Sequence, residues 1–235
     1  MARPLRILQD EFPYHVTTRT NNKRVRFKHW KKQLKIFSEI INLAVNNYGL
    51  VLEHFIIMGT HYHMIARTPR KNLDRIMQVI NSKLARKYNK LLKRSGHFWG
   101  ERYHDTILDT ELAYANCVNY LYRNPARAGL PLEQHLKDNS TFSCYAYGHE
   151  VEVIVTPDEV YLSLAETPQE RQAQFIEGIT SPMSAEAERE IKEALHKQLY
   201  GTAAFLERMK TRFGDRLRMS RIKPLVVQET TSERS

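Results

Sequence analysis

Two apolar segments joined by a short turn constrain the fold of this chain more than any other feature. Residues 50–58 read LVLEHFIIM, a nearly continuous apolar run, and residues 61–68 read HYHMIART. Gly59 and Thr60 lie between them, and a two-residue connection that begins with glycine is typical of a tight β-hairpin. The pattern therefore predicts a central antiparallel pair of strands.

Helical patterns precede and follow this hairpin. Apolar residues recur every three or four positions over 30–48 and again over 73–91, which is the spacing of amphipathic helices. Residues 12–20 are rich in aromatic and β-branched side chains and predict a first strand, and residues 97–108 predict a loop that leads into a fourth. The order β-α-β-β-α-β predicts an α+β, ferredoxin-like fold: a four-stranded antiparallel sheet with two helices on one face.

The chain beyond these elements is predicted to be mainly helical. A third helix is expected from Glu111 to Asn124, ending there because the residue before a proline disfavours helical backbone. The segment 131–140 indicates a boundary, so we expect a domain at 1–130 and an extension at 131–235. The extension has helical patterns at 157–164, 168–178 and 185–212.

Charge is distributed unevenly along the chain. Residues 1–130 contain 23 Lys and Arg against 9 Asp and Glu, a net of +14, whereas residues 131–235 contain 13 against 17. Such a basic body favours a polyanionic partner, nucleic acid ahead of an anionic membrane surface, and a domain that is merely basic is the alternative.

The sequence gives no sign of export or of membrane insertion. The N-terminus, MARPLRILQDEF, lacks the apolar segment of a secretory signal. No stretch approaches the ~18 apolar residues that span a membrane. The chain has 2 cysteines and no CxxC pair. A reducing compartment suits this composition, so we expect a cytoplasmic protein.

Two histidines share one face of the predicted hairpin. Side chains alternate along a strand, so His61 and His63 point to one side, and Tyr62 and Met64 to the side that suits the two covering helices. Two histidines at i and i+2 can bind one divalent cation through their neutral nitrogens. The alternative is a pair of solvated strand histidines.

The third helix brings further candidates for chemistry. Tyr120 and Asn124 are four residues apart and therefore lie on the same helix face. If this helix packs across the histidine face, it brings a phenol and an amide oxygen to the same cation. The alternative for Tyr120 is a core aromatic. Tyr122 points to a different side of the helix and is expected to be a packing or surface residue.

Four blocks of sequence, in order, resemble the HUH single-tyrosine transposases, and specifically the REP-associated tyrosine transposase family. The blocks are YHVTTRTNNK, THYHMI, GHFWGERYHDTIL and NYLYRNPARAGL, with a weaker FSCYAYG, and they span residues 14–148. Two departures are modest: the turn is Gly59-Thr60 where the family commonly has Pro-Asn, and the residue between the histidines is aromatic rather than aliphatic.

The resemblance implies an activity and a site. The activity is metal-dependent cleavage and rejoining of single-stranded or hairpin DNA through a 5′-phosphotyrosine intermediate, as in DNA transposition. Tyr120 would be the nucleophile, and His61, His63 and Asn124 would bind Mg²⁺ or Mn²⁺. The resemblance favours a monomer, with a homodimer as the alternative.

Two other functions stay open at the level of sequence. A DNA-hairpin-binding protein of the same fold without strand transfer is the main one. A metal-dependent phosphohydrolase is the weaker one, because MIARTPRK lacks the additional His or Asp that usually follows an HxH pair in such enzymes.

Polar and basic side chains near these motifs are expected to bind DNA, and Trp99 to stack on an unpaired base. The predicted nucleic-acid-binding residues are Arg19, Asn21, Asn22, Lys23, Arg24, Trp99, Arg102 and Arg127. Solvated surface charge is the alternative for any single one of them. Cleavage is also expected to fall as the pH drops through about 6.5, because a protonated imidazole cannot bind a metal.

Overall fold

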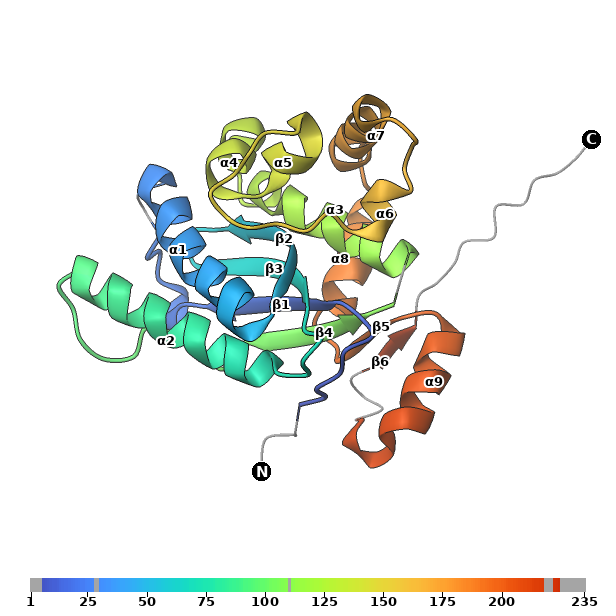
Figure 1. Cartoon of the computed structure of the whole chain (residues 1–235), viewed down its shortest axis with the longest axis horizontal. Coiled ribbons are helices and arrows are strands. Elements are labelled where there is room, and N and C mark those ends of the chain that lie inside the picture. The colour runs from blue at the N-terminus through green and yellow to red at the C-terminus, as the bar shows by residue number, and fades with distance from the viewer. Residues whose placement is uncertain (1–5, 28–29, 110, 218–221, 225–235) are drawn as a thin grey trace, which may run out of the picture.

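The predicted hairpin lies inside the central sheet of the computed structural model, which describes residues 6–27, 30–109, 111–217 and 222–224 (Figure 1). Four antiparallel strands are ordered β2-β3-β1-β4. Their bounds are β1 (Tyr14–Arg19), β2 (Val51–Ile57), β3 (His61–Arg67) and β4 (His104–Leu108). The amide of Met58 donates to the carbonyl of His61 at 2.8 Å, which closes the two-residue turn at Gly59 and Thr60. This order is the ferredoxin-like arrangement.

Helices cover both faces of this sheet. Helices α1 (Trp30–Tyr48) and α2 (Leu73–Leu91) lie on one face, and α3 (Leu112–Arg127) lies on the other (Figure 1). The two faces bury separate apolar cores, one around Phe37 and Met64 under α1 and α2, the other around Ile65 and Leu121 under α3. The predicted α+β fold with a tyrosine-bearing helix on the second face is confirmed.

The C-terminal part is mostly helical, as predicted. It contains α4 (Leu132–Asn139), α5 (Phe142–Tyr147), α6 (Glu159–Leu162), α7 (Pro168–Thr180), α8 (Ala185–Ala194) and α9 (Ala203–Phe213), with a 3-10 turn, η2 (Gly214–Arg216). The segment expected to be a boundary forms α4, which packs against α1 and β2. Within the described ranges, none of the helices is both long enough and apolar enough to cross a membrane.

Two short strands, β5 (Leu199–Gly201) and β6 (Ile222–Pro224), extend the sheet beyond β4 in parallel. The helical pattern predicted over 185–212 is therefore wrong at β5. The reason is the open edge of β4: the amides of Ile107 and Asp109 donate to the carbonyls of Gln198 and Tyr200, both at 2.9 Å. Backbone groups at a buried edge need such partners, and the pairing leaves no trace in local periodicity.

A β-bulge interrupts the pairing of β2 with β3. The register shifts between Leu52 and His54, so Glu53 is the additional residue. Leu52 and Phe55 belong to the core under α1 and α2, whereas Glu53 and His54 both bond to tyrosines of α3. The bulge thus directs two consecutive ionisable side chains to the α3 face.

Helix α3 continues past its predicted end at Asn124 and contains Pro125 in its last turn. Proline has no amide hydrogen, which would leave the carbonyl of Leu121 unpaired. The side chain of Asn124 replaces that donor: its Nδ2 bonds to the carbonyl of Leu121 at 3.1 Å and to that of Tyr120 at 3.0 Å. The helix therefore reaches Arg127.

The contact between β5 and β4 generates a stability prediction. A Cβ at Gly201 would lie 2.3 Å from the Cβ of Asp109 and 2.6 Å from the Cδ1 of Phe205. We expect Gly201→Ala to lower the free energy of unfolding by about 1–3 kcal/mol, because overpacking of this kind displaces backbone. Urea denaturation measures the change.

Gly178 provides the matched control, because it lies inside α7 and a Cβ there meets nothing within 4 Å. Gly178→Ala should raise the free energy of unfolding by about 0.5–1 kcal/mol, since alanine favours a helix interior. Equal stability of the two variants would show that β5 does not pack closely on Asp109.

Candidate active site under helix α3

Strands β1 and β3 place polar side chains side by side on the α3 face of the sheet. In their antiparallel register, the pairs on this face are Arg19 with His61, Thr17 with His63 and His15 with Ile65. The alternate positions of both strands face α1 and α2. A row of histidine and arginine side chains therefore lies beneath α3.

The two predicted metal ligands have their ring nitrogens arranged in the same way. The Nδ1 of His61 lies 2.9 Å from the Oγ1 of Thr60, and the Nδ1 of His63 lies 2.9 Å from the Nε2 of His15. The Nε2 of His63 is buried and has no hydrogen-bond partner among the described residues. A buried polar atom without a partner calls for an explanation, and a metal ligand before it binds its ion is one.

Both imidazoles are neutral in the folded protein. Burial, with a contribution from Arg19 and Arg127, lowers the pKa of His61 to about 3. Burial and the neighbouring His61 hold the pKa of His63 well below its ordinary value. Neutral imidazole is the form that binds a metal. The fall in cleavage near pH 6.5 stays a prediction, and the lowered pKa values of these rings favour a fall at a lower pH.

Tyr120 lies against this pair. Its side chain is 9 % exposed, and its ring meets the ring of His63 edge-on, with centroids 6.3 Å apart and an angle of 83°. The guanidinium carbon of Arg127 lies 3.8 Å from the centre of the Tyr120 ring, and its Nη2 donates to the Tyr120 carbonyl at 2.9 Å. Burial raises the pKa of the Tyr120 phenol, while Arg127 and Arg19 oppose that rise. The phenol is thus protonated at neutral pH.

Asn124, the third predicted ligand, lies one helical turn beyond Tyr120 on α3. Because its Nδ2 bonds to helix carbonyls, its Oδ1 is the atom left to act as a ligand. No three His, Cys, Asp or Glu side chains in the described ranges form a metal-binding cluster. Two imidazole nitrogens and one amide oxygen would form a neutral ligand set that leaves positions for phosphate oxygens.

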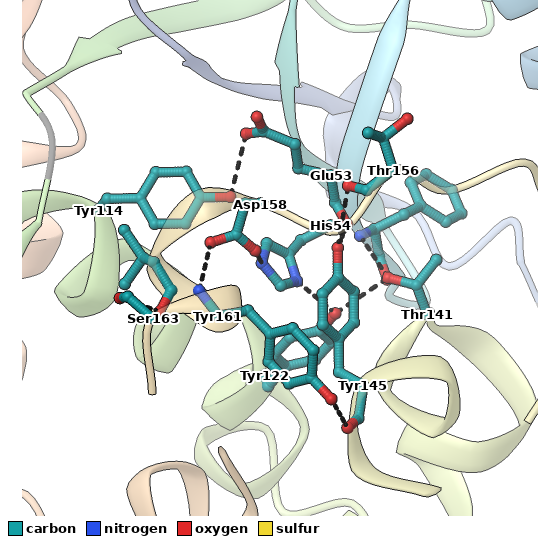
Figure 2. Close-up of polar contacts among 12 residues, drawn as sticks. Glu53, His54, Tyr114, Tyr122, Thr141, Tyr145, Thr156, Asp158, Tyr161 and Ser163 are labelled. Carbon is teal, nitrogen blue, oxygen red and sulfur yellow. Dashed lines mark hydrogen bonds and ion pairs between the residues drawn. The ribbon is translucent and has the colours of Figure 1, made fainter. Parts of the chain in front are cut away.

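Tyr122 has a different environment, shown in Figure 2. It is fully buried, and its hydroxyl bonds to the Nδ1 of His54 and to the Oγ1 of Thr141, both at 2.9 Å. The Nε2 of His54 in turn lies 2.9 Å from the Oδ2 of Asp158. Tyr122 therefore joins α3 to β2 and to the C-terminal extension, and it is a packing residue, not a surface one.

A second set of hydrogen bonds holds the N-terminal end of α3. The hydroxyl of Tyr114 donates to the Oε2 of Glu53 at 3.0 Å, and the Nε of Arg67 donates to the Oε1 of the same carboxylate at 2.6 Å. Burial raises the pKa of Glu53 and the charge of Arg67 opposes it. Tyr114 and Tyr122 thus anchor α3 on either side of Tyr120.

Sequence reasoning missed the residues that support the site, namely His15, Glu53, His54 and Asp158. His15 carried a usable signal, because it alternates with Thr17 and Arg19 on one face of β1. The other three carried none, since the bulge and the path of the C-terminal extension bring them together.

Most of the predicted DNA-binding residues border the site. Arg19 and Arg127 both lie close enough to affect the pKa of Tyr120. The 3-10 turn η1 (Asn21–Lys23) and Arg24 form an exposed loop beside the hairpin turn. Bonds from the amide of Thr20 to the carbonyl of Thr60, and from that of Arg26 to Gly59, hold this loop against the turn.

Trp99 pairs through its backbone with Thr20 beside this loop, but the side chains of Trp99 and Arg102 lie elsewhere. With residues of α2 they line an open hollow of about 530 Å³ on the other side of the sheet. The Nε1 of Trp99 donates to the carbonyl of Asn81 at 2.8 Å, and its ring packs against Phe27, Tyr62 and Phe98. The structure therefore divides the predicted DNA-binding residues between two sides of the sheet.

The two tyrosines should respond differently to loss of their hydroxyl groups. Tyr122→Phe leaves the Nδ1 of His54 without its buried partner and removes one partner of Thr141, so we expect a loss of about 1–3 kcal/mol in the free energy of unfolding. Tyr120→Phe should change it less, since the partner of its hydroxyl is the part-exposed guanidinium of Arg127. Thermal and urea denaturation of the two variants compare them, and equal effects would contradict the assigned environments.

The buried histidines also predict how stability depends on pH. His15 and His61 both have a pKa of about 3 when folded, lowered chiefly by burial, against an ordinary value of 6.5. The unfolded chain therefore binds more protons between these values, so stability is complete above about pH 6.5 and falls as the pH drops towards 3. Denaturation of the metal-free protein at several pH values tests this, and His61→Gln should reduce the slope.

Comparisons with known proteins agree with this architecture. The family model described as "Transposase IS200 like" matches residues 9–124. Among solved structures, a REP-associated tyrosine transposase bound to a REP hairpin is similar to 68 % of this chain and 96 % of its own, with a TM-score of 0.52 and 17 % identity. A candidate transposase from Deinococcus radiodurans R1 aligns over 53 % of this chain and 97 % of its own, with a TM-score of 0.35 and 17 % identity. No curated protein matches the sequence.

The family model covers the hairpin, the histidine pair and the tyrosine helix up to Asn124. The first of the solved structures shares the fold over most of its own length. Residues 9–124, just under half of the chain, are thus similar to the IS200-like transposase family.

Proposed function

We propose that this protein cleaves and rejoins single-stranded DNA through a covalent link to Tyr120, with the help of Mg²⁺ or Mn²⁺. The observation that carries the proposal is the position of Tyr120, edge-on to His63 and beneath the guanidinium of Arg127. The proposed nucleophile, two neutral imidazoles and the charged guanidinium of Arg127 thus lie on one face of the sheet. The match of residues 9–124 to the IS200-like transposase model supports the same proposal.

The substrate is expected to be unpaired DNA beside a hairpin. A duplex would hide the phosphate from a tyrosine that is held against the sheet. The basic loop at η1 borders the site, and residues 1–130 carry a net charge of +14. The similar solved structure is bound to a REP hairpin, which supports a hairpin as the recognised element.

The chemistry assigned to this chain is a phosphoryl transfer. The phenolic oxygen of Tyr120 attacks the phosphorus, the bond from phosphorus to the 3′-oxygen breaks, and the departing 3′-oxygen takes up a proton equivalent to the one that the phenol releases. Attack of a 3′-hydroxyl on the phosphotyrosine reverses the step, so rejoining needs no ATP. A divalent cation supplies positive charge that favours the phenolate and offsets charge on the phosphate.

Individual side chains prepare this step. His61 and His63 are neutral and so available to bind the cation, and Asn124 can offer its Oδ1. Arg127 holds the Tyr120 ring in place and adds a positive charge that lowers the pKa of the phenol. A protonated phenol is a weak nucleophile, so both sources of positive charge have to act on it.

The anchoring of α3 supports a monomer that uses its own tyrosine. Two buried hydroxyl contacts, from Tyr114 to Glu53 and from Tyr122 to His54, tie the helix to the sheet that carries the histidines. A monomer forms both contacts within one chain and needs no exchange of helices between subunits. A homodimer in which each chain keeps its own helix is the alternative.

The test is a covalent adduct. Labelled single strands that contain a hairpin are incubated with the protein and Mg²⁺, then denatured and separated by electrophoresis. We expect a denaturation-resistant adduct with the wild type and none with Tyr120→Phe, because the attacking oxygen is gone. DNA affinity should change by less than ~1 kcal/mol, since phosphate contacts come from the basic side chains.

Two variants control for the loss of a tyrosine hydroxyl elsewhere. Tyr147→Phe removes a hydroxyl from an exposed side chain of α5, and Tyr122→Phe removes a buried one on the same helix as Tyr120. Both should form the adduct at temperatures where they are folded. An adduct that persists in Tyr120→Phe would identify another nucleophile. Hairpin binding without any adduct in the wild type would favour a DNA-binding protein without strand transfer.

A further inference from the structure

We propose that His15 is a positioning residue for the cation site: it accepts a hydrogen bond from the Nδ1 of His63 and so reserves the Nε2 of His63 for a divalent cation. This inference rests on the proposed function, because it concerns the metal site of that reaction. It adds a residue of β1 to a site otherwise built from β3 and α3.

The geometry of the two rings supports this role. The Nε2 of His15 lies 2.9 Å from the Nδ1 of His63, and the ring planes are 18° apart with centroids 5.1 Å apart, so the two rings meet edge to edge through these nitrogens. Their exposed fractions are 1 % and 5 %. Water therefore does not substitute for either partner, and each ring fixes the hydrogen position of the other.

Each neutral imidazole has a hydrogen on only one of its two nitrogens, so the contact between His15 and His63 has two forms. In the first, His63 donates through Nδ1 to His15, which leaves a lone pair on the Nε2 of His63. In the second, His15 donates to His63, whose own hydrogen is then on Nε2 and blocks a metal. Only the first form can bind a cation.

Without a cation the two forms are balanced. The Nδ1 of His15 and the Nε2 of His63 are both buried and lack partners among the described residues. Each form therefore leaves one buried N–H and one buried lone pair unpaired. A cation at the Nε2 of His63 breaks this balance in favour of the first form, and His15 then carries its hydrogen on Nδ1.

His61 has a partner of a different kind. The Oγ1 of Thr60 lies 2.9 Å from its Nδ1, and a hydroxyl can rotate to donate or to accept. Thr60 therefore adapts to either form of His61, whereas His15 and His63 must change together. The affinity of the site for a divalent cation should consequently depend on His15, although His15 is not itself a predicted ligand.

Two substitutions of His15 separate positioning from packing. His15→Gln keeps an acceptor that can reach the Nδ1 of His63, whereas His15→Leu fills similar space without one. We expect Mn²⁺ binding, followed by electron paramagnetic resonance of the purified protein, to weaken by about 10–100-fold in His15→Leu. His15→Gln should stay closer to the wild type than to His15→Leu.

His135→Gln is the matched control. His135 is also buried and bonds to a backbone carbonyl, that of Ile57, through its Nε2. It lies in α4 and bonds to β2, which is two strands from the β1 strand that carries His15. Its substitution should leave Mn²⁺ affinity unchanged.

A direct measurement reads the hydrogen positions in the wild type. Long-range proton–nitrogen correlation spectra of ¹⁵N-histidine-labelled protein distinguish a hydrogen on Nδ1 from one on Nε2. We expect Mg²⁺ to shift His63 fully to the Nδ1–H form. A hydrogen on the Nε2 of His63 in the presence of saturating Mg²⁺ would overturn the inference, whatever the stability of the variants.

The remaining outcomes are also decisive. Equal weakening of Mn²⁺ binding in His15→Gln and His15→Leu would show that His15 only fills space. A wild type that binds no Mn²⁺ would remove the metal site and this role with it. The covalent adduct at Tyr120 is a separate readout, so an adduct formed with normal Mn²⁺ affinity in His15→Leu would overturn the role of His15 alone.

Discussion

Two hydroxyl groups of α3, bonded to consecutive residues of β2, determine where the site forms. Glu53 and His54 point to the same face because a β-bulge separates their pairing, and they receive Tyr114 and Tyr122. These tyrosines are eight positions apart on the helix, and Tyr120 lies between them. A buried hydrogen bond is costly to leave unmade, so the helix has one well-defined position over the sheet. The distance between Tyr120 and the histidines follows from that position.

The electrostatics of the site follow from burial on that same face. Imidazoles that would be half protonated near pH 6.5 in water are neutral here, and the phenol is held protonated. Among the described residues that face Tyr120, the positive charge is on Arg19 and Arg127. In the proposed reaction, such a site attracts a phosphate and accepts a cation without an opposing ionised ligand. Activation of the tyrosine would then depend on the arrival of substrate and metal together.

Much of this arrangement could be predicted from local pattern. The alternation in HYHMIART placed His61 and His63 on one face, and the four-residue spacing placed Tyr120 and Asn124 on one side of α3. Strand β5 could not be predicted, because its pairing with β4 depends on an edge that lies 90 residues earlier in the chain. The bulge at Glu53 could not be predicted either, because the side chains that Glu53 and His54 bond to are in α3 and in the C-terminal extension. The place of the Trp99 ring could not be predicted either, because it packs on aromatic residues that are distant in sequence, Phe27 and Tyr62.

The proline in α3 restricts which side chain can precede it. The amide of Asn124 has to donate to the carbonyl of Leu121, and this contact fixes which way the amide is turned. Aspartate has no hydrogen to donate, so its negative oxygens would face a carbonyl and the last turn would lose its support. The added charge would also oppose an incoming phosphate. In a single rotamer, Asn124 therefore donates to the helix carbonyl that Pro125 leaves unpaired and orients a neutral side-chain oxygen. A chain under selection for both properties would have few other residues to use at this position.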